Sequence, residues 1–251
     1  MVTTIYDLRS FYECRKGLII QPLLQHKILS FWPDAKGLRM LGSGYAVPFL
    51  DPYLETAERV IAVMPPRAGA HAWTPDGKNH AVLSAETELP IETESVDRIL
   101  LVHGLEYTQT MGPYLQELWR VLKSTGRILI VTPNRLGMWS RAEWSPFGHG
   151  TPFSGSQLSH ALRENLFVIE RTDRALYVPP FRSSFLLRSA LPLEKFGDKF
   201  MRGMAGVLMV EASKQLYGGV LAQENARITS GRRRVLVAST APGSGKSFKN
   251  G

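Results

Sequence analysis

A glycine-rich turn, Gly42-Ser-Gly44-Tyr-Ala46, lies between a short apolar run and a stretch of helical length. Glycines at such a turn let the chain bend sharply and let a ligand approach the backbone, because they carry no Cβ. In this context the turn predicts nucleotide binding at the end of a strand. Rossmann-like units add an acidic side chain about 20 residues later to hold the ribose hydroxyls. Here that position is Met64.

The turn belongs to a longer alternation of strands and helices. Runs such as Arg59-Val-Ile-Ala-Val-Met64 and Arg127-Ile-Leu-Ile-Val-Thr132 are almost entirely apolar, which is typical of strands buried on both faces. Stretches with apolar residues at helical spacing separate several of these runs. We expect strands near 38–44, 59–64, 80–83, 96–103, 127–132, 167–171 and 207–211.

Proline and glycine set the expected helix boundaries. We expect Pro22 to split the apolar stretch 6–29 into two helices, because proline lacks an N–H. Gly126 follows a helix expected over 114–122, and we expect it to help terminate that helix in a left-handed conformation. Further helices are expected between the first two strands, from Ser154 or Ser156 to about 164, and within 180–204.

This alternation predicts an α/β fold with a Rossmann-like, mostly parallel sheet of about seven strands and helices on both faces. We expect one domain over 36–217, with inserts at 135–153 and 180–204. Helices over 1–35 would precede this domain, and a basic tail over 218–251 would follow it.

The charge of the chain gathers near its C-terminus. The 251 residues carry a formal net charge of +8, which on its own suggests a nucleic-acid or membrane-surface partner. No acidic residue follows Glu224, so the last 27 residues hold +6 and residues 1–224 hold only +2. We therefore expect nucleic acid as a partner only through the tail, with its cluster Arg232-Arg-Arg234.

Cysteine content and hydropathy indicate the compartment. Cys14 is the only cysteine, which excludes an intrachain disulfide and Cys-rich zinc sites. Charged residues interrupt the N-terminal region before an apolar run reaches the length of a signal peptide. Glycines and prolines break the longest uncharged stretch, 144–162, so it is not expected to span a membrane. We expect a cytoplasmic protein without a bound metal.

Four segments then occur in an order that is more specific than any of them alone. They are Leu89-Pro-Ile91, Ser95-Val-Asp-Arg-Ile-Leu-Leu-Val-His-Gly-Leu-Glu106, Leu115-Gln-Glu-Leu-Trp-Arg-Val-Leu-Lys123 and Gly126-Arg-Ile-Leu-Ile-Val131. Over about 36–170 the chain resembles the class I S-adenosylmethionine-dependent methyltransferases of the type-11 group. The resemblance implies the fold of that class and S-adenosylmethionine as the cofactor.

By that resemblance, the cofactor would lie at the C-terminal ends of the strands, where open α/β sheets bind ligands. Gly42, Ser43 and Gly44 would lie beneath its methionine part. Met64 would take the place of the acid that binds the ribose. Glu86, in the turn after the third strand, would face the adenine amino group.

The resemblance also implies a methyl-transfer cleft. His103 and Gly104, at the end of the fourth strand, would line it, and His103 is the candidate catalytic base. The alternative is that His103 is only a hydrogen-bonded residue at a strand end. The loop that carries Trp139, Trp144 and His149 follows the fifth strand, where an acceptor-binding lid is expected. Simple packing of a long loop is the alternative there, and His149 is the second choice of base.

The function implied is transfer of a methyl group by direct displacement to a small molecule or an unidentified macromolecule. This chemistry requires alignment, exclusion of water and sometimes a base, rather than a nucleophile–base triad. Met40 and Met64 stand where the family has acids, so the affinity for the cofactor would either be low or depend on substitutes such as Asp51 or Glu86. These departures favour a second hypothesis, a non-catalytic protein of this fold that binds a partner. We expect Glu106 to be a structural charge.

Overall fold

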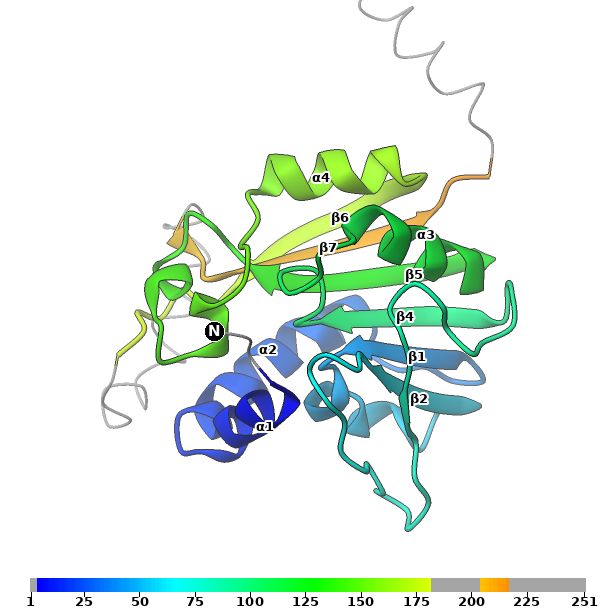
Figure 1. Ribbon diagram of the computed structural model, residues 1–251, viewed down its shortest axis with the longest axis horizontal. Helices are drawn as coiled ribbons and strands as arrows, with labels where there is room; N and C mark the ends of the chain where they lie inside the picture. Colours follow the sequence, from blue (N-terminus) through cyan, green and yellow to red (C-terminus); the bar gives the residue numbers. More distant parts are fainter. Residues whose placement is uncertain (1–3, 182–203, 217–251) are drawn as a thin grey trace, which may run out of the picture. The chain divides into compact units, whose positions relative to one another are not determined.

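A computed structural model describes residues 4–181 and 204–216, so most of the expected insert 180–204 and all of the expected tail 218–251 lie outside the described residues. The described chain forms one seven-stranded sheet in the order β3-β2-β1-β4-β5-β7-β6 (Figure 1). Its strands are β1 (Arg39–Gly44), β2 (Arg59–Met64), β3 (Ala81–Leu83), β4 (Val96–Val102), β5 (Leu122–Pro133), β6 (Phe167–Ala175) and β7 (Val207–Lys214).

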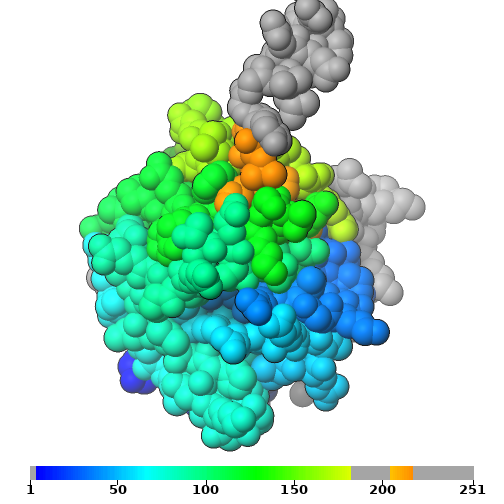
Figure 2. Space-filling model, turned by 90° about the vertical axis from the view of Figure 1, so that its right-hand side faces the viewer, coloured from blue at the N-terminus to red at the C-terminus, as the bar shows by residue number. Residues whose placement is uncertain are grey.

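The sheet is parallel from β3 to β5 and antiparallel around β7. β7 lies between β5 and β6, and Figure 2 shows this last described segment, in orange, between the green and yellow-green segments. The prediction of a mostly parallel sheet of about seven strands is confirmed. The C-terminal ends of β1, β2, β4 and β5 all lie at the same edge of the sheet.

Helices cover both faces, as expected. Along β4 the side chains of Leu100 and Val102 belong to one core cluster with helices α1 (Ile5–Glu13) and α2 (Gly17–Phe31). Ile99 and Leu101 point the opposite way and pack with α3 (Met111–Val121) and α4 (Gly155–Glu164). This period of two gives the sheet two apolar faces, each of which requires a covering layer. Within residues 4–181 and 204–216, no helix is both long enough and apolar enough to cross a bilayer.

The first helical stretch breaks at Cys14–Lys16, and the prediction of a break at Pro22 is wrong. Gly17 begins α2 so close to α1 that a Cβ on it would overlap the carbonyl oxygen of Phe11. The glycine therefore permits the close approach of the two helices.

Pro22 remains inside α2 although it cannot donate a backbone hydrogen bond. A proline in a helix costs about 3 kcal/mol. Ile20, Leu24 and Ile28 are all fully buried on the inner face of α2. Each such burial contributes roughly 1.5–3 kcal/mol, so the packing of the helix outweighs the proline.

The helix expected between β1 and β2 is also absent. Two short 3-10 helices stand in its place, η1 (Val47–Phe49) and η2 (Asp51–Tyr53). Each contains a proline, Pro48 and Pro52, and two missing N–H donors four residues apart would interrupt an α-helix in this short connection.

Gly126 does not end α3 in a left-handed conformation. α3 stops at Val121, Leu122 is already extended, and Gly126 lies inside β5 without a positive φ. Leu122 is fully buried and pairs with Val96 in the sheet. The chain is therefore already extended before it reaches Gly126, and the helix ends without a glycine cap. At α4 the expected start is resolved in favour of Ser154, which forms a capping box with Gln157.

Candidate functional site

The glycine turn is the end of β1 packed against β4. Gly44 still pairs with Val102, has a φ of +72°, and would place a Cβ in collision with the carbonyl oxygen of that residue. A Cβ on Gly42 would lie 2.6 Å from Cδ1 of Leu50. Gly44 is therefore required by a backbone contact, whereas at Gly42 the side chain of Leu50 would have to shift. Both glycines are buried.

The neighbouring positions expected to contact the cofactor are buried as well. The Oγ of Ser43 lies 2.6 Å from the Oη of Tyr114 in α3, and Ser43 is 2% exposed. Met40 and Met64 point into the apolar core that lies under α1 and α2. No carboxylate is contributed by any of these three positions.

Glu86 lies in the connection after β3 and is only partly buried. One of its carboxylate oxygens accepts a hydrogen bond of 2.5 Å from Oγ1 of Thr108, in the connection after β4. This contact joins two loops at the C-terminal edge of the sheet. Glu86 thus lies at the edge of the sheet where open α/β folds bind ligands.

His103, directly after β4, is the centre of a buried polar chain. Its Nε2 lies 2.8 Å from Oη of Tyr12 in α1, and its Nδ1 lies 2.9 Å from Oε1 of Glu106. The other carboxylate oxygen of Glu106 accepts a hydrogen bond of 3.3 Å from Oγ1 of Thr132 in β5. We call Tyr12, His103, Glu106 and Thr132 the strand-end chain. Each of its four residues is buried.

Protonation within the strand-end chain follows from burial. Desolvation raises the pKa of Tyr12 well above its ordinary value, and the Glu106 carboxylate raises it further. The neutral phenol therefore donates to Nε2 of His103, which leaves the Nδ1 hydrogen of a neutral imidazole to donate to Glu106. This arrangement satisfies both ring nitrogens of His103 inside the protein.

The backbone of His103 is also unusual. Its φ is +49°, in the left-handed region that side chains other than glycine seldom occupy. Such strain persists only where the surroundings impose it, and it concentrates at functional sites. Here the two hydrogen bonds and the close contact of the ring with Phe147, at 5.0 Å between centroids, hold the residue in place.

Three members of the strand-end chain, Tyr12, Glu106 and Thr132, were not predicted as site residues. Glu106 was expected to be a structural charge, although its spacing of three residues from His103 at a strand end was a visible signal. Tyr12 is 91 residues away from His103 in sequence, and no local pattern connects them. Only the packing of α1 over the strand ends brings this phenol to the site.

α1 forms the roof of the site. The ring of Tyr12 stacks on Tyr45 at 6.0 Å and meets Phe49 edge-on at 5.5 Å. The backbone N–H of Ile5 donates to the carbonyl oxygen of Ala68, in the segment after β2. These contacts exclude water from the strand-end chain.

The loop that carries Trp139, Trp144 and His149 is buried in part and lies near the surface in part. Trp139 is fully buried, and its indole N–H donates to the carbonyl oxygen of Val178 at 2.7 Å. Trp144 is half-buried, with Nζ of Lys16 placed 4.2 Å from the centroid of its ring. His149 is half-buried. The geometry of Trp139 is that of loop packing, whereas Trp144 and His149 stay near the surface.

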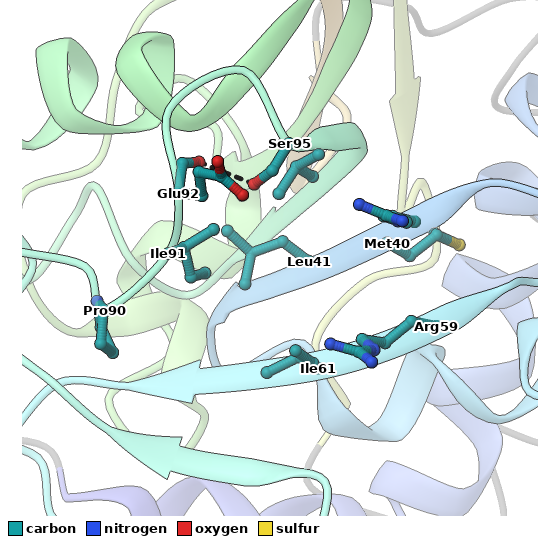
Figure 3. A pocket seen from close by; sticks show the side chains of 10 residues that line it. Met40, Leu41, Arg59, Ile61, Pro90, Ile91, Glu92 and Ser95 are labelled. Carbon is teal, nitrogen blue, oxygen red and sulfur yellow. Dashed lines mark hydrogen bonds between the residues drawn. The ribbon is translucent and has the colours of Figure 1, made fainter.

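Two pockets flank the sheet at opposite edges. One, of about 200 Å³, lies at the starts of β1, β2 and β4, where Leu41 and Ile91 point toward each other (Figure 3). Ligands of open α/β sheets bind at the other edge. There, beside Tyr12 and Tyr45, lies a pocket of about 540 Å³, which we call the aromatic pocket.

Comparison with known proteins identifies the fold and gives a family match over part of the chain. A family model described as a methyltransferase domain matches residues 40–130. This segment is similar to methyltransferase domains. No curated protein matches the chain. The matched segment runs from β1 into β5 and so contains the glycine turn, Glu86 and His103.

Solved structures share the fold of this chain. A methyltransferase from Thermotoga maritima, described as a possible histamine N-methyltransferase, is 15% identical, with a TM-score of 0.57 over 84% of this chain and 96% of that one. A putative methyltransferase from Haloferax volcanii, in complex with the activator Trm112, is 13% identical, with a TM-score of 0.60 over 86% and 99%. One from Aquifex aeolicus is 15% identical, with a TM-score of 0.56 over 83% and 97%. The fold is that of a class I methyltransferase.

The class I methyltransferase fold implies S-adenosylmethionine, and the donor set of this chain fits it incompletely. The resemblance would place carboxylates for the ammonium and the ribose hydroxyls at two positions that here are Met40 and Met64, which are 2% and 0% exposed. At these two positions the residues present do not fit the cofactor. Glu86 and the strand-end chain are the polar groups that this edge retains.

Proposed function

We propose that this protein is an S-adenosylmethionine-dependent methyltransferase that transfers a methyl group to an acceptor by direct displacement. The family match and the class I fold support the reaction class. The observation that carries the proposal is the strand-end chain, a buried histidine with a strained backbone at the edge where this fold binds ligands. The packing of apolar side chains does not by itself require a buried His–Glu pair at this position.

In this proposal the strand-end chain handles a proton. Glu106 holds Nδ1 of His103 and fixes the ring, so that Nε2 is the atom that can accept a proton. In the described structure Tyr12 donates to that atom. Release of the Tyr12 hydroxyl therefore has to precede any proton transfer from an acceptor to His103. α1, which carries Tyr12, also keeps water out of the site.

A second candidate function rests on a specific observation. Met40 and Met64 are buried in the apolar core, and Gly42 and Gly44 are packed against protein atoms. A domain that had lost the chemistry but kept the fold would show these features. The second candidate is therefore a non-catalytic protein of this fold that binds a partner.

Labelled methyl transfer separates the two candidates. The full chain is incubated with S-adenosylmethionine labelled in its methyl group and with a lysate depleted of small molecules, and in parallel with the small-molecule fraction alone. The methyltransferase proposal predicts label in one of the two fractions, lost with His103→Ala. Absence of label in both fractions, with a folded protein, favours the non-catalytic candidate.

A further inference from the structure

We propose that the aromatic pocket binds an organic ammonium ion, a ligand with an apolar body and a protonated amine. As an acceptor site this inference rests on the proposed methyltransferase function, but as a binding site it stands on the pocket alone. The pocket opens at the C-terminal side of β1 and β2, between α1, the η1–η2 segment and residues 71–75. Its volume of about 540 Å³ suits a small organic molecule.

Aromatic side chains form much of its wall. Tyr45 stacks on Tyr12 with an interplanar angle of 29°, and the ring of His71 meets Tyr45 at 5.9 Å. Trp73 contributes an indole that is 8% exposed. Aromatic faces attract cations through their negative π surface, and tryptophan does so most strongly.

The charges of the lining favour a cation over an anion. Arg9 and Glu13 form an ion pair of 2.7 Å, so they neutralise each other. Asp51 forms no ion pair within the part of the chain that the structure describes, and one of its carboxylate oxygens accepts only a long hydrogen bond of 3.3 Å from Nε1 of Trp73. The pocket is left with one carboxylate that no cation of the described chain balances.

His71 adds a second acceptor. Its Nδ1 lies 2.9 Å from the carbonyl oxygen of Ala72, which can only accept, so the hydrogen of the neutral ring is on Nδ1. Its Nε2 is then an acceptor, and this atom is buried without a hydrogen-bond partner. An acceptor nitrogen and an unbalanced carboxylate in an aromatic pocket together suit a ligand rich in N–H donors and positive in charge.

Tyr12 connects this pocket to the strand-end chain. Its side chain contributes to the pocket wall, while its Oη is bound to Nε2 of His103. Only the side chain of Tyr12 would therefore separate an ammonium ion in the pocket from His103. This adjacency is what makes an amine the acceptor class that fits the proposed function.

Binding of simple probes tests the site. 2-Phenylethylamine, which is protonated at neutral pH, is titrated into the full chain by calorimetry and by tryptophan fluorescence, with 2-phenylethanol as the neutral analogue and adenosine as the nucleoside. We expect saturable binding of the amine, about tenfold tighter than that of the alcohol. We expect Asp51→Asn to weaken the binding of the amine by about tenfold. Glu164→Gln, an exposed carboxylate on α4, is the matched control and should change nothing.

The outcomes separate this inference from the proposed function. Equal binding of amine and alcohol, or no effect of Asp51→Asn, overturns the ammonium site. Tighter binding of adenosine, or competition between the amine and S-adenosylhomocysteine with Asp51→Asn weakening both, assigns the pocket to the cofactor instead. If the amine fails to bind while S-adenosylhomocysteine binds, the ammonium site is wrong and the proposed function stands. Circular dichroism of Asp51→Asn verifies that the variant is folded.

Discussion

The hydroxyl of Tyr12, in the first helix, lies 2.8 Å from Nε2 of His103, at the end of the fourth strand. This hydrogen bond joins the N-terminal helix to the edge of the sheet where open α/β folds bind ligands. It occupies the one nitrogen of His103 that Glu106 leaves available. The state of the site is therefore coupled to the position of α1.

Tyr12→Phe removes this hydroxyl and keeps the ring contacts. Nε2 of His103 would remain buried without a partner, which costs about 1–3 kcal/mol. Urea unfolding followed by circular dichroism measures the loss. Tyr6→Phe, on the same helix but 62% exposed, should stay within about 0.5 kcal/mol of the wild type. Equal stability of the two variants would show that the hydrogen bond contributes nothing.

Gly44→Ala tests whether the glycine turn is needed for internal packing. A left-handed alanine costs about 1–2 kcal/mol by itself, and at Gly44 its Cβ would also collide with the carbonyl oxygen of Val102. Gly37→Ala is the matched control, because Gly37 has a φ of +69° and no atom lies within 4 Å of the place that a Cβ would take. We expect Gly44→Ala to lower the free energy of unfolding by at least about 2 kcal/mol more than Gly37→Ala. Similar losses would contradict the close contact with β4.

Tyr114 makes stability depend on alkaline pH. Burial raises its pKa in the folded protein, while the unfolded phenol ionises near its ordinary value of about 10. The folded state keeps the proton that the unfolded state loses, so the stabilisation is present below about pH 10 and declines above it. Between about pH 10 and about pH 11, Tyr114→Phe should lose stability less steeply than the wild type, by about 1.4 kcal/mol per pH unit at most. Parallel curves in urea titrations would exclude this linkage.

The central parallel strands were predictable because they contain nearly continuous apolar runs, and a parallel sheet buried on both faces leaves that signature along the sequence. β2 begins and ends where its run does, at Arg59 and Met64. Local signals misled where tertiary packing decided the result. Pro22 was expected to end a helix, but the buried residues around it keep α2 continuous. Leu122 was expected to be helical, but it pairs with β4 in the sheet.

The site was predictable only in part, for a related reason. His103 and Glu86 could be placed at the strand ends because strand boundaries locate that edge. The roles of Tyr12 and Glu106 depend on distances across the fold, and a sequence does not contain those distances. The aromatic pocket likewise joins segments after β1 and after β2 to α1, and no single stretch of sequence displays it.

Pro22→Ala tests the account of α2. Pro22 is exposed, and an alanine there would restore the N–H that can donate to the carbonyl oxygen of Leu18. We expect the free energy of unfolding to rise by about 1–3 kcal/mol. A thermal melt compared with the wild type measures it, and an unchanged or lower midpoint would mean that the helix adapts to proline without cost.

Calorimetric titration of the full chain with S-adenosylhomocysteine tests the proposed function most directly. The account predicts one bound molecule per chain, weakened about tenfold by Glu86→Gln because that change removes the carboxylate at the ligand-binding edge. Glu88→Gln, an exposed position in the same connection, should leave the affinity unchanged. Absence of binding at millimolar ligand by the folded wild-type protein would contradict the proposal that this domain is an S-adenosylmethionine-dependent methyltransferase.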